Sequence, residues 1–302
     1  MYKYFIYFLL FFVSVIIALS IIIPIVFGLY LVYIMFFQIS YREIDIWHKI
    51  SSKFTSWLTK YTNISENFIV IDKENIDPMK QYVYVFYPHG MFAISQIIHV
   101  SSTESAFAPY LYNSVHACHS LFYSIPIIRE ISLLFKGIPA NREYLDHYLQ
   151  AGKSVSINPA GLQDIQYCTY RNRNIDHIYI TKRKGFIYAA KENNVDIVPI
   201  YCWNEQTVLR HTQSLDFLTN ILSKCGIRFD CNAFQGLSPT NIIKTLSMIF
   251  GKETGTVAYC GTPISVKDKT IDEIHAEFIQ SMKTLFEKAN ADHGSHKTLV
   301  IV

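Results

Sequence analysis

Residues 82–90 read Tyr-Val-Tyr-Val-Phe-Tyr-Pro-His-Gly. The first six, Tyr82–Tyr87, form a short apolar run rich in β-branched and aromatic side chains, which is typical of a buried strand. Pro88 ends this run, and Met91–Val100 can continue as a helix. His89 is therefore expected at the carboxyl end of a strand and the start of a helix, where open α/β sheets bind their ligands.

Further short apolar runs predict more buried strands, with amphipathic stretches between them. This alternation favours an α/β domain with a largely parallel sheet. The additional strands are expected at Ser154–Asn158, Val195–Tyr201 and Thr256–Cys260, and helices at Tyr144–Ala151 and Gly185–Asn193.

The clearest helix begins at a T-x-x-E capping box formed by Thr270 and Glu273. Apolar residues then recur at helical spacing until Gly294 ends the pattern. The spacing predicts a packing face and no functional site. Its members are Ile274, Phe278, Met282, Leu285, Phe286 and Ala289.

The first forty residues carry no charge between Lys3 and Arg42. A charge at the centre of a membrane helix costs about 2.5–3.5 kcal/mol, so this run predicts a membrane-embedded segment. As one straight helix it would measure roughly 57 Å, against about 30 Å of bilayer core. Pro24 and Gly28 lie near its middle, so we expect a transmembrane hairpin over residues 1–41; one long kinked span is the alternative. A secretory signal would have a much shorter apolar core.

Basic residues follow this run at Arg42, Lys49 and Lys53, which places the downstream body on the cytosolic side. We expect a juxtamembrane interfacial segment at 42–78 and the main domain at 79–302. The net charge of +3 and the lack of a long basic block argue against a nucleic-acid partner. The six cysteines show no C-x-x-C spacing, so they predict neither a zinc site nor a redox pair.

Three segments contain residues that could do chemistry. Gly90 lets a substrate approach the backbone beside His89, and a helix N-terminus would keep that imidazole neutral. The turn Asn158–Asp164 follows a strand and brings Asp164 near the same sheet edge. The basic triplet and glycine at Lys182–Gly185 precede a helix and could bind an anion. A hydrogen-bonded turn, a plain loop and a solvated basic turn are the corresponding structural alternatives.

Other common signatures are absent from the sequence. His116 and His119 are three residues apart and could share a helical face, but no nearby acidic residue completes a metal set. No G-x-S-x-G, P-loop or G-x-G-x-x-G occurs.

Taken in order, these segments resemble the type-2 diacylglycerol acyltransferase family, which includes monoacylglycerol and wax-alcohol acyltransferases. The family's His-Pro-His-Gly is similar to Tyr87–Gly90, and its Pro-Gly-Gly-x-Gln-Glu turn is similar to Pro159–Asp164. Its Arg-x-Gly-Phe and Val-Pro-x-Tyr-x-Phe-Gly-Glu blocks are similar to Arg183–Phe186 and Val198–Glu205. Further similar segments are Arg129-Glu130 followed by Asn141-Arg142, Gly261–Ile264, and His275 on the last helix.

Four positions depart from the family pattern. Tyr87 replaces the first histidine, and Ala160 replaces the first glycine of the Gly-Gly pair. Asp164 is shorter than the family's glutamate by one methylene, and Asn204 replaces a glycine. His89 itself is kept.

The resemblance implies a glycerolipid-acyltransferase-like α/β domain behind a transmembrane hairpin. It implies transfer of a fatty acyl group from acyl-CoA to a neutral lipid alcohol, with diacylglycerol expected as the acceptor and triacylglycerol as the product. Monoacylglycerol or a fatty alcohol is the alternative acceptor. A non-catalytic lipid-binding membrane protein and a lipid hydrolase are the alternative functions. Acyl-CoA is expected as co-substrate, with no metal or other cofactor.

The same resemblance implies the site residues and the location. A bilayer resembling that of the endoplasmic reticulum is expected to hold the protein, and a homo-oligomer is left open. Any acid that orients the His89 ring must be Asp164, Glu130 or Glu205. The residues implied in catalysis are His89, Gly90 and Asp164, and those implied in substrate binding are Arg183, Lys184, Gly185, Glu205, Arg129, Glu130 and Gly161.

Overall fold

The three-dimensional structure is a computed structural model of the 302-residue chain. Its described residues are 20, 22–34, 39–61, 68–70, 75–101, 108–111, 113–168, 174–208, 214–225, 231–232, 235, 238–241, 243 and 256–302.

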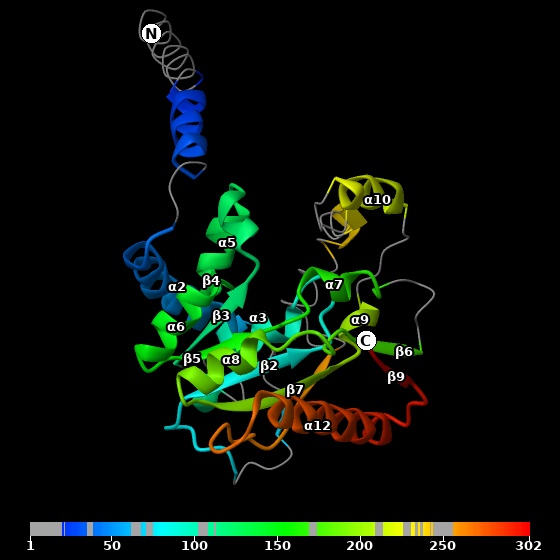
Figure 1. Cartoon of the computed structure of the whole chain (residues 1–302). Coiled ribbons are helices and arrows are strands. Elements are labelled where there is room, and N and C mark those ends of the chain that lie inside the picture. Colours follow the sequence, from blue (N-terminus) through cyan, green and yellow to red (C-terminus); the bar gives the residue numbers. More distant parts are fainter. Residues whose placement is uncertain are drawn as a thin grey trace, which may run out of the picture.

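A seven-stranded sheet forms the centre of the protein (Figure 1). The strand order is β1–β8–β7–β2–β5–β3–β4, and every neighbouring pair is parallel except β7 and β8. The prediction of a mostly parallel α/β sheet is therefore confirmed. The strands are β1 (Phe68–Val70), β2 (Tyr82–Tyr87), β3 (Ser114–Cys118), β4 (Gly137–Pro139), β5 (Ser154–Ile157), β7 (Asp196–Trp203) and β8 (Val257–Cys260).

A separate pair of parallel strands lies near the carboxyl ends of the central strands. It consists of β6 (Ile175–Ile178) and β9 (Thr298–Ile301). Neither strand was predicted from the sequence. β6 is only four residues long and alternates between buried and partly exposed residues, and β9 is equally short.

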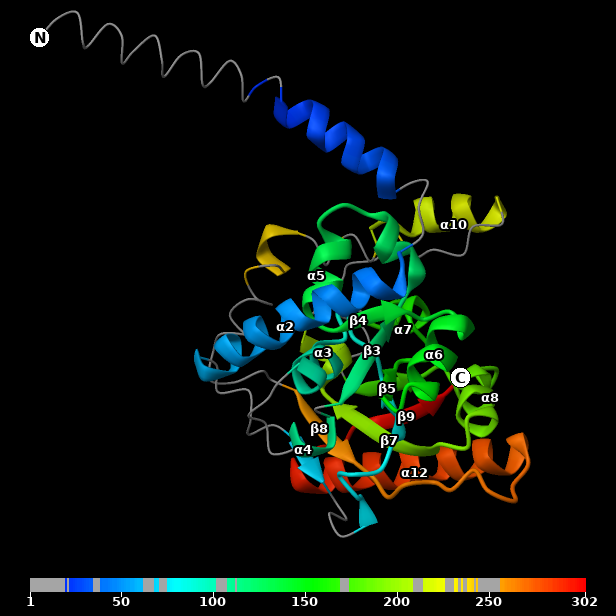
Figure 2. The same ribbon diagram turned by 90° about the vertical axis from the view of Figure 1, so that its left-hand side faces the viewer.

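Helices cover both faces of the sheet, and a short 3₁₀ helix, η3, follows β3 (Figures 1 and 2). The predicted helices near residues 144–151 and 185–193 are confirmed as α6 and α8. The helices are α2 (Tyr41–Tyr61), α3 (Ile94–Ser101), α4 (Ala108–Leu111), η3 (Ser120–Ser124), α5 (Ile128–Leu134), α6 (Arg142–Gln150), α7 (Leu162–Ile165), α8 (Gly185–Glu192), α9 (Glu205–Val208), α10 (Asp216–Lys224) and α12 (Ile271–Asp292).

The alternation of β2 divides the core into two layers. Val83, Val85 and Tyr87 join the larger cluster, which includes buried residues of α6, α8 and α12. Tyr84 and Phe86 face the other way, into a smaller cluster that α3 and α4 complete. Successive strand residues point to opposite faces, so this fully buried strand needs apolar residues at every position.

The capping box and apolar stripe of α12 are confirmed. Thr270 Oγ1 accepts a hydrogen bond from the Glu273 N–H at 3.2 Å, and the Glu273 carboxylate accepts one from the Thr270 N–H at 2.6 Å. All six stripe residues are buried, and the chain leaves the helix through Gly294 at a φ of 55°. Gly294 can adopt this left-handed conformation without a Cβ clash, which ends the helix here.

The amino-terminal region contributes two helices to the described part of the chain. Residues 22–34 form the first, which rises away from the body, and α2 follows (Figure 2). Ile44 of α2 is fully buried and Trp47 packs against the larger core cluster, so α2 is tied to the domain along one side.

The hairpin predicted over residues 1–41 falls largely outside the described residues, which omit 1–19, 21 and 35–38. Among the helices that the structure does describe, none combines the length and the apolar character needed to cross a membrane. The hairpin therefore stays a prediction.

Candidate active site

The loop after β2 carries His89, as predicted, but the helix begins later than expected. Helix α3 starts at Ile94, so the imidazole does not sit on a helix N-terminus. The physical reason is a contact with Glu205, a residue far from α3 in the sequence. The Glu205 carboxylate accepts a hydrogen bond from the Ser95 N–H at 3.3 Å and another from the Ser95 hydroxyl at 2.6 Å. This remote carboxylate caps the first turn of α3 at Ile94–Ser95.

The His89 ring is held by its own loop. Its Nδ1 contacts the Gly90 carbonyl oxygen, and because a carbonyl can only accept, Nδ1 carries the proton and donates. Nε2 is then the nitrogen with the free lone pair. Burial lowers the pKa of His89 to about 4, partly offset by the Gly90 carbonyl, so the ring is neutral at pH 7. The Nδ1 partner is thus a backbone carbonyl, and none of the three acids proposed to orient the ring is its partner.

Asp164 lies beside His89, which confirms its expected placement at the same sheet edge. Its Oδ2 accepts from the backbone N–H of His89 at 2.9 Å, and its Oδ1 accepts from the Tyr179 N–H at 3.3 Å. Burial raises the pKa of Asp164 to about 8, against the two backbone donors and the charge of Arg183. The carboxyl group thus positions the backbone that presents the imidazole.

Glu205 closes the other side of the same loop. It lies at the end of β7, and burial raises its pKa to about 7, although it accepts hydrogen bonds from the start of α3. A Cβ added at Gly90 would lie 2.6 Å from the Glu205 carbonyl oxygen and 3.2 Å from its Cγ. Gly90 is therefore required by a close approach of two backbone segments.

The turn after β5 adopts the form that its small residues predicted. Gly161 has a φ of 54°, a region that glycine enters freely, and it directly precedes α7, which carries Asp164. The Gly161 N–H donates to Asn158 Oδ1 at 3.4 Å. This turn fixes the distance between β5 and the Asp164 carboxyl group.

His116 is a further candidate, which the sequence suggested only as a possible neighbour of His119 on a helical face. It lies in β3, opposite Ser156 of β5, so it does not share a helical face with His119. His119 instead accepts a hydrogen bond from the Leu121 N–H and caps η3. Burial, and then the nearby His48 and His89, lower the pKa of His116 to about 4. Only the strand order β2–β5–β3 brings these imidazoles near one another, so spacing along the chain gave no signal.

The gathered histidines do not form a metal centre. Within the described ranges, no group of three or more His, Cys, Asp or Glu side chains could hold a metal ion. The neutral imidazole of His89 can transfer a proton, and buried carboxyl groups shape the loops around it.

A pocket of about 480 Å³ lies at the basic segment before α8. Its lining includes the cations Lys182, Arg183 and Lys184 together with Gly185, and it reaches Pro159 of the Asp164 turn. Arg183 donates to Gln163 and lies 5.3 Å from the centre of the Tyr179 ring, while its buried Nε has no partner in this part of the structure. Lys184 pairs with Asp272 at 2.5 Å. The pocket can accept an anionic group. Arg183 still has an N–H that it can donate to such a group, whereas Lys184 is held by its ion pair with Asp272.

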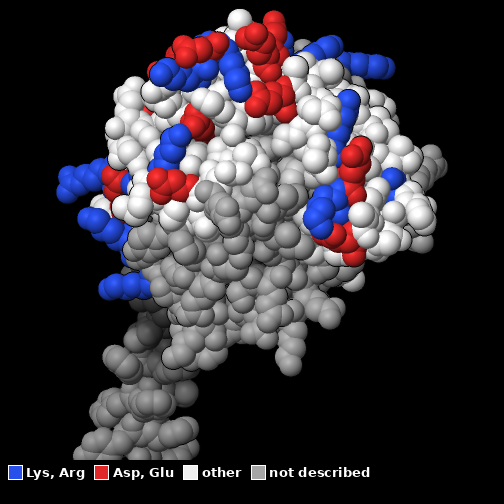
Figure 3. Space-filling model, turned by 90° about the horizontal axis from the view of Figure 1, so that it is seen from below, with Lys and Arg blue, Asp and Glu red and all other residues white. Residues whose placement is uncertain are grey.

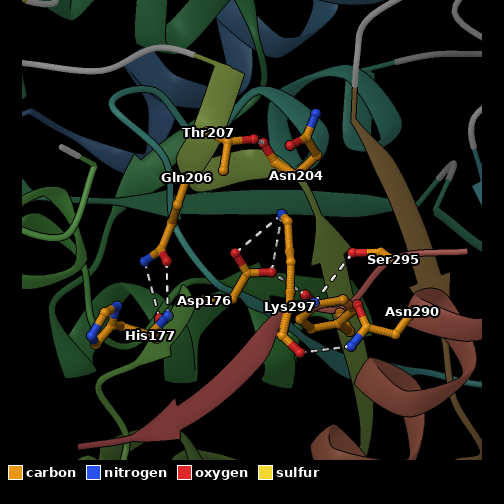
Figure 4. Close-up of polar contacts among 9 residues, drawn as sticks. Asp176, His177, Asn204, Gln206, Thr207, Asn290, Ser295 and Lys297 are labelled. Atoms are coloured by element: carbon orange, nitrogen blue, oxygen red, sulfur yellow. Dashed lines mark hydrogen bonds and ion pairs between the residues drawn. The ribbon is translucent and has the colours of Figure 1, made fainter. Parts of the chain in front are cut away.

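A hydrogen-bonded frame holds β6, the strand that precedes this basic loop (Figure 4). Lys297, directly before β9, reaches the buried Asp176 of β6 at 3.2 Å, and the Tyr201 hydroxyl donates to Asp176 at 2.5 Å. Gln206 binds both backbone groups of His177, at 2.9 and 3.0 Å. These contacts fix β6, which leads directly into Tyr179 and the basic loop.

Arg129 and Glu130 are not brought to this site by their contacts. Arg129 is buried, donates to Glu43 of α2 and lies 5.2 Å from the centre of the Tyr33 ring. Glu130 accepts from the Ile127 N–H at 2.9 Å and from the Tyr30 hydroxyl. The pair therefore joins α5 to α2 and to the helix of residues 22–34, and its expected role in substrate binding stays a prediction.

Comparison with known proteins gives a consistent match over the chain. The family model described as "Diacylglycerol acyltransferase" matches residues 15–302. "Diacylglycerol O-acyltransferase 2" of Danio rerio is 25% identical, over 77% of this chain and 68% of its own length. "2-acylglycerol O-acyltransferase 1" of Homo sapiens is 22% identical, over 90% and 85%. "Acyl-CoA wax alcohol acyltransferase 1" of Mus musculus is 24% identical, over 77% and 74%.

Among solved structures, a similar chain is the crystal structure of the 1-acyl-sn-glycerophosphate (LPA) acyltransferase, PlsC, from Thermotoga maritima. It is 11% identical with a TM-score of 0.42, covering 87% of this chain and 88% of that one.

Proposed function

This chain belongs to the diacylglycerol acyltransferase family, and from that premise we propose that it transfers a fatty acyl group from acyl-CoA to the free hydroxyl of diacylglycerol. The product is triacylglycerol, and the enzyme is an acyl-CoA-dependent O-acyltransferase. The observation that carries the mechanism is the state of His89: a neutral ring whose Nδ1–H is bound to the Gly90 carbonyl, with the Nε2 lone pair left for a proton.

The reaction begins with proton transfer to that nitrogen. His89 Nε2 takes the proton of the lipid hydroxyl, and the oxygen forms a bond to the thioester carbonyl carbon. The carbon–sulfur bond of the tetrahedral intermediate then breaks. The CoA thiolate leaves and takes the proton from the imidazolium. No covalent acyl-enzyme is needed, since both substrates meet at one base.

Two neighbouring segments support the charges that form. Backbone N–H groups of the Gly90 segment are suited to the oxyanion of the intermediate, since the Gly161 N–H is already bound to Asn158. Asp164 and Glu205 hold the His89–Gly90 loop from its two sides. They act as positioning residues.

The basic pocket is proposed to bind the phosphates of acyl-CoA. Arg183 has a buried N–H without a partner, and Lys182, Lys184 and Gly185 line the same space. A guanidinium with unused donors binds phosphate oxygens strongly. The charge-free amino-terminal run is proposed to anchor the enzyme as a hairpin in an endoplasmic-reticulum-like membrane, with the domain on the cytosolic side.

One assay tests this function. Membranes containing the full chain, or its His89→Ala variant, are incubated with labelled acyl-CoA and a panel of diacylglycerol, monoacylglycerol and fatty alcohol. We expect labelled triacylglycerol with the unaltered chain and its loss with the variant. Labelled diacylglycerol or wax ester instead would reassign the acceptor. Free fatty acid formed without any acceptor would indicate a hydrolase, and no product at all would indicate a lipid-binding relative without activity.

A further inference from the structure

Helix α10 has its apolar residues on the outside. Phe217 is 70% exposed, and Leu218 and Ile221 are exposed beside it. Two of its polar residues instead contact the protein. The Thr219 hydroxyl accepts from the Cys231 N–H at 2.9 Å, and Asp216 accepts from the Asn232 side chain at 2.7 Å. A surface helix of a soluble protein normally has the opposite orientation, with its apolar stripe buried.

A second group of exposed apolar residues lies at the start of α5. Ile127 is 67% exposed and has a φ of 71°, which is an outlier for a β-branched residue. A γ-turn holds it there, because the Ile128 N–H donates to the Pro126 carbonyl at 2.8 Å. Ile131, one helical turn further on, is also exposed. The turn thus keeps the large apolar side chain of Ile127 exposed at the surface.

The helix of residues 22–34 is tied down next to this turn. The Tyr30 hydroxyl donates to Glu130, and the Tyr33 hydroxyl donates to Glu43 at 2.9 Å. Beyond these tyrosines the helix exposes a series of apolar side chains. They are Ile22, Ile23, Ile25, Val26, Phe27 and Leu29.

These three apolar elements lie at one end of the molecule. Figures 1 and 2 share a vertical axis, and in both the amino-terminal helix, α5 and α10 stand at the top. The described part of the opposite end carries Lys, Arg, Asp and Glu side chains of both signs (Figure 3). Ion pairs such as Lys269–Glu277 and Lys288–Asp292 lie on α12 or just before it, away from the apolar end. An apolar end opposite a charged one fits a bilayer surface.

We propose that α10 and the α5 turn form a second membrane contact, which inserts into the headgroup region beside the anchor. The membrane-contact face consists of Ile127, Ile131, Phe217, Leu218 and Ile221. Its occupant is the lipid bilayer, because the face continues the apolar surface of residues 22–29. The inference rests on the proposed amino-terminal anchor and is independent of which alcohol is acylated. With these contacts the apolar end of the domain faces the membrane.

The test places a photoreactive residue at single positions of the full chain. p-Benzoylphenylalanine is introduced at Phe217 or Ile127, the protein is reconstituted in phosphatidylcholine vesicles with an alkyne-labelled lipid, and cross-linked lipid is detected after irradiation. The matched control position is Met79, which is 92% exposed but precedes the amino end of β2. Val26, on the amino-terminal helix, reports on the anchor.

We expect lipid cross-links at Phe217, Ile127 and Val26, and none above background at Met79. Cross-links at Val26 but not at Phe217 or Ile127 would overturn the second contact and leave the anchor standing. The loss of all three would overturn both. A cross-link from Phe217 to a second copy of the chain would also overturn the proposal, since the occupant would then be protein.

Discussion

The Asp164 carboxyl group binds the backbone of His89, with Oδ2 2.9 Å from the amide nitrogen. Its other oxygen binds the backbone of Tyr179. One buried side chain therefore joins the loop after β2 to the loop after β6. The imidazole and the basic pocket are held in a fixed relation by this bridge, although the two loops lie far apart in the sequence.

Replacing His89 tests the proposed base directly. General-base catalysis typically contributes about 10²–10⁴-fold, so His89→Ala should lower kcat by that factor. The KM for acyl-CoA should change little, because the basic pocket is separate from the ring. His89→Gln fills the space without a basic nitrogen and should be equally inactive. Near-normal kcat in either folded, membrane-bound variant would contradict the mechanism.

The buried acid Asp164 should make stability depend on pH. Its pKa is raised from 3.8 to about 8, so the folded protein retains a proton that the unfolded chain has released. The contribution of Asp164 to the free energy of unfolding is then fully present at low pH. It falls as pH rises from about 4 to about 8, by on the order of 1 kcal/mol per pH unit.

Asp164→Asn cannot ionise and should reduce this fall, although Glu205, whose pKa is raised to about 7, contributes a change of the same sign. Thermal unfolding in detergent at pH 5 and pH 8 measures the effect. Asp272→Asn is the control, because that exposed carboxyl group has a lowered pKa and titrates below this window. An unchanged pH dependence in Asp164→Asn would show that burial does not govern this group.

Gly90 should not tolerate a side chain. Alanine there would place a carbon 2.6 Å from the Glu205 carbonyl oxygen, so one of the two backbones must move. We expect Gly90→Ala to lose about 1–3 kcal/mol of stability and most of the activity. Gly185→Ala is the matched control for stability, because nothing lies within 4 Å of a Cβ at that position. Equal melting temperatures for the two variants would argue against the close approach.

Arg183 is expected to bind acyl-CoA and not the lipid acceptor. A lost charge-assisted hydrogen bond is worth about 1.5–3 kcal/mol, so Arg183→Ala should raise the acyl-CoA KM roughly ten- to a hundredfold. Lys288→Ala, which removes an exposed cation from α12, should leave that KM unchanged. Steady-state kinetics with each substrate varied in turn separate the two cases. A change confined to the acceptor KM would assign the pocket to the lipid.

Lys297 should be important for stability. Its ammonium group pairs with Asp176 in the interior, and Lys297→Met would leave that carboxylate buried and uncompensated. Removing one partner of a buried pair typically costs about 3–5 kcal/mol. Lys288→Met breaks an exposed pair and should cost at most about 1 kcal/mol. Similar melting temperatures for the two variants would show that the Asp176 pair is dispensable.

Local patterns predicted the elements that are themselves local. The bounds of β2 follow from its apolar run, and the start of α12 follows from the Thr270–Glu273 box, which involves residues only three apart. Strands β5, β7 and β8 were also predicted to within two residues, whereas β1, β3 and β4 were not predicted. The small sheet of β6 and β9 was missed, because both strands are short and the two lie far apart in the sequence.

The sequence predicted which residues meet at the sheet edge better than it predicted the contacts that those residues make. His89 and Asp164 were expected at one edge, because the carboxyl ends of parallel strands meet there. The cap that Glu205 places on α3 joins positions 110 residues apart, and no spacing rule reveals such a contact. The proximity of His116 depends on strand order in the same way. The contacts of Arg129 and Glu130 with the amino-terminal helices could not be read from the sequence, because their partners lie 86 and 100 positions away.

The pairing of β6 with β9 bears on the order in which the protein folds. Asp176 and Lys297 are 121 positions apart, and the Ile180 and Thr181 N–H groups both donate to the Val302 carbonyl at 2.9 Å. Contacts of such high sequence separation form slowly, because a long chain segment must first be closed into a loop. The pairings of β3 with β5 and of β2 with β5 join segments that are closer in the sequence, so they can form earlier than this pair. The loop with Tyr179 and Arg183 is thus expected to become rigid only in the last stage of folding, and hydrogen exchange there should remain fast until β9 has docked.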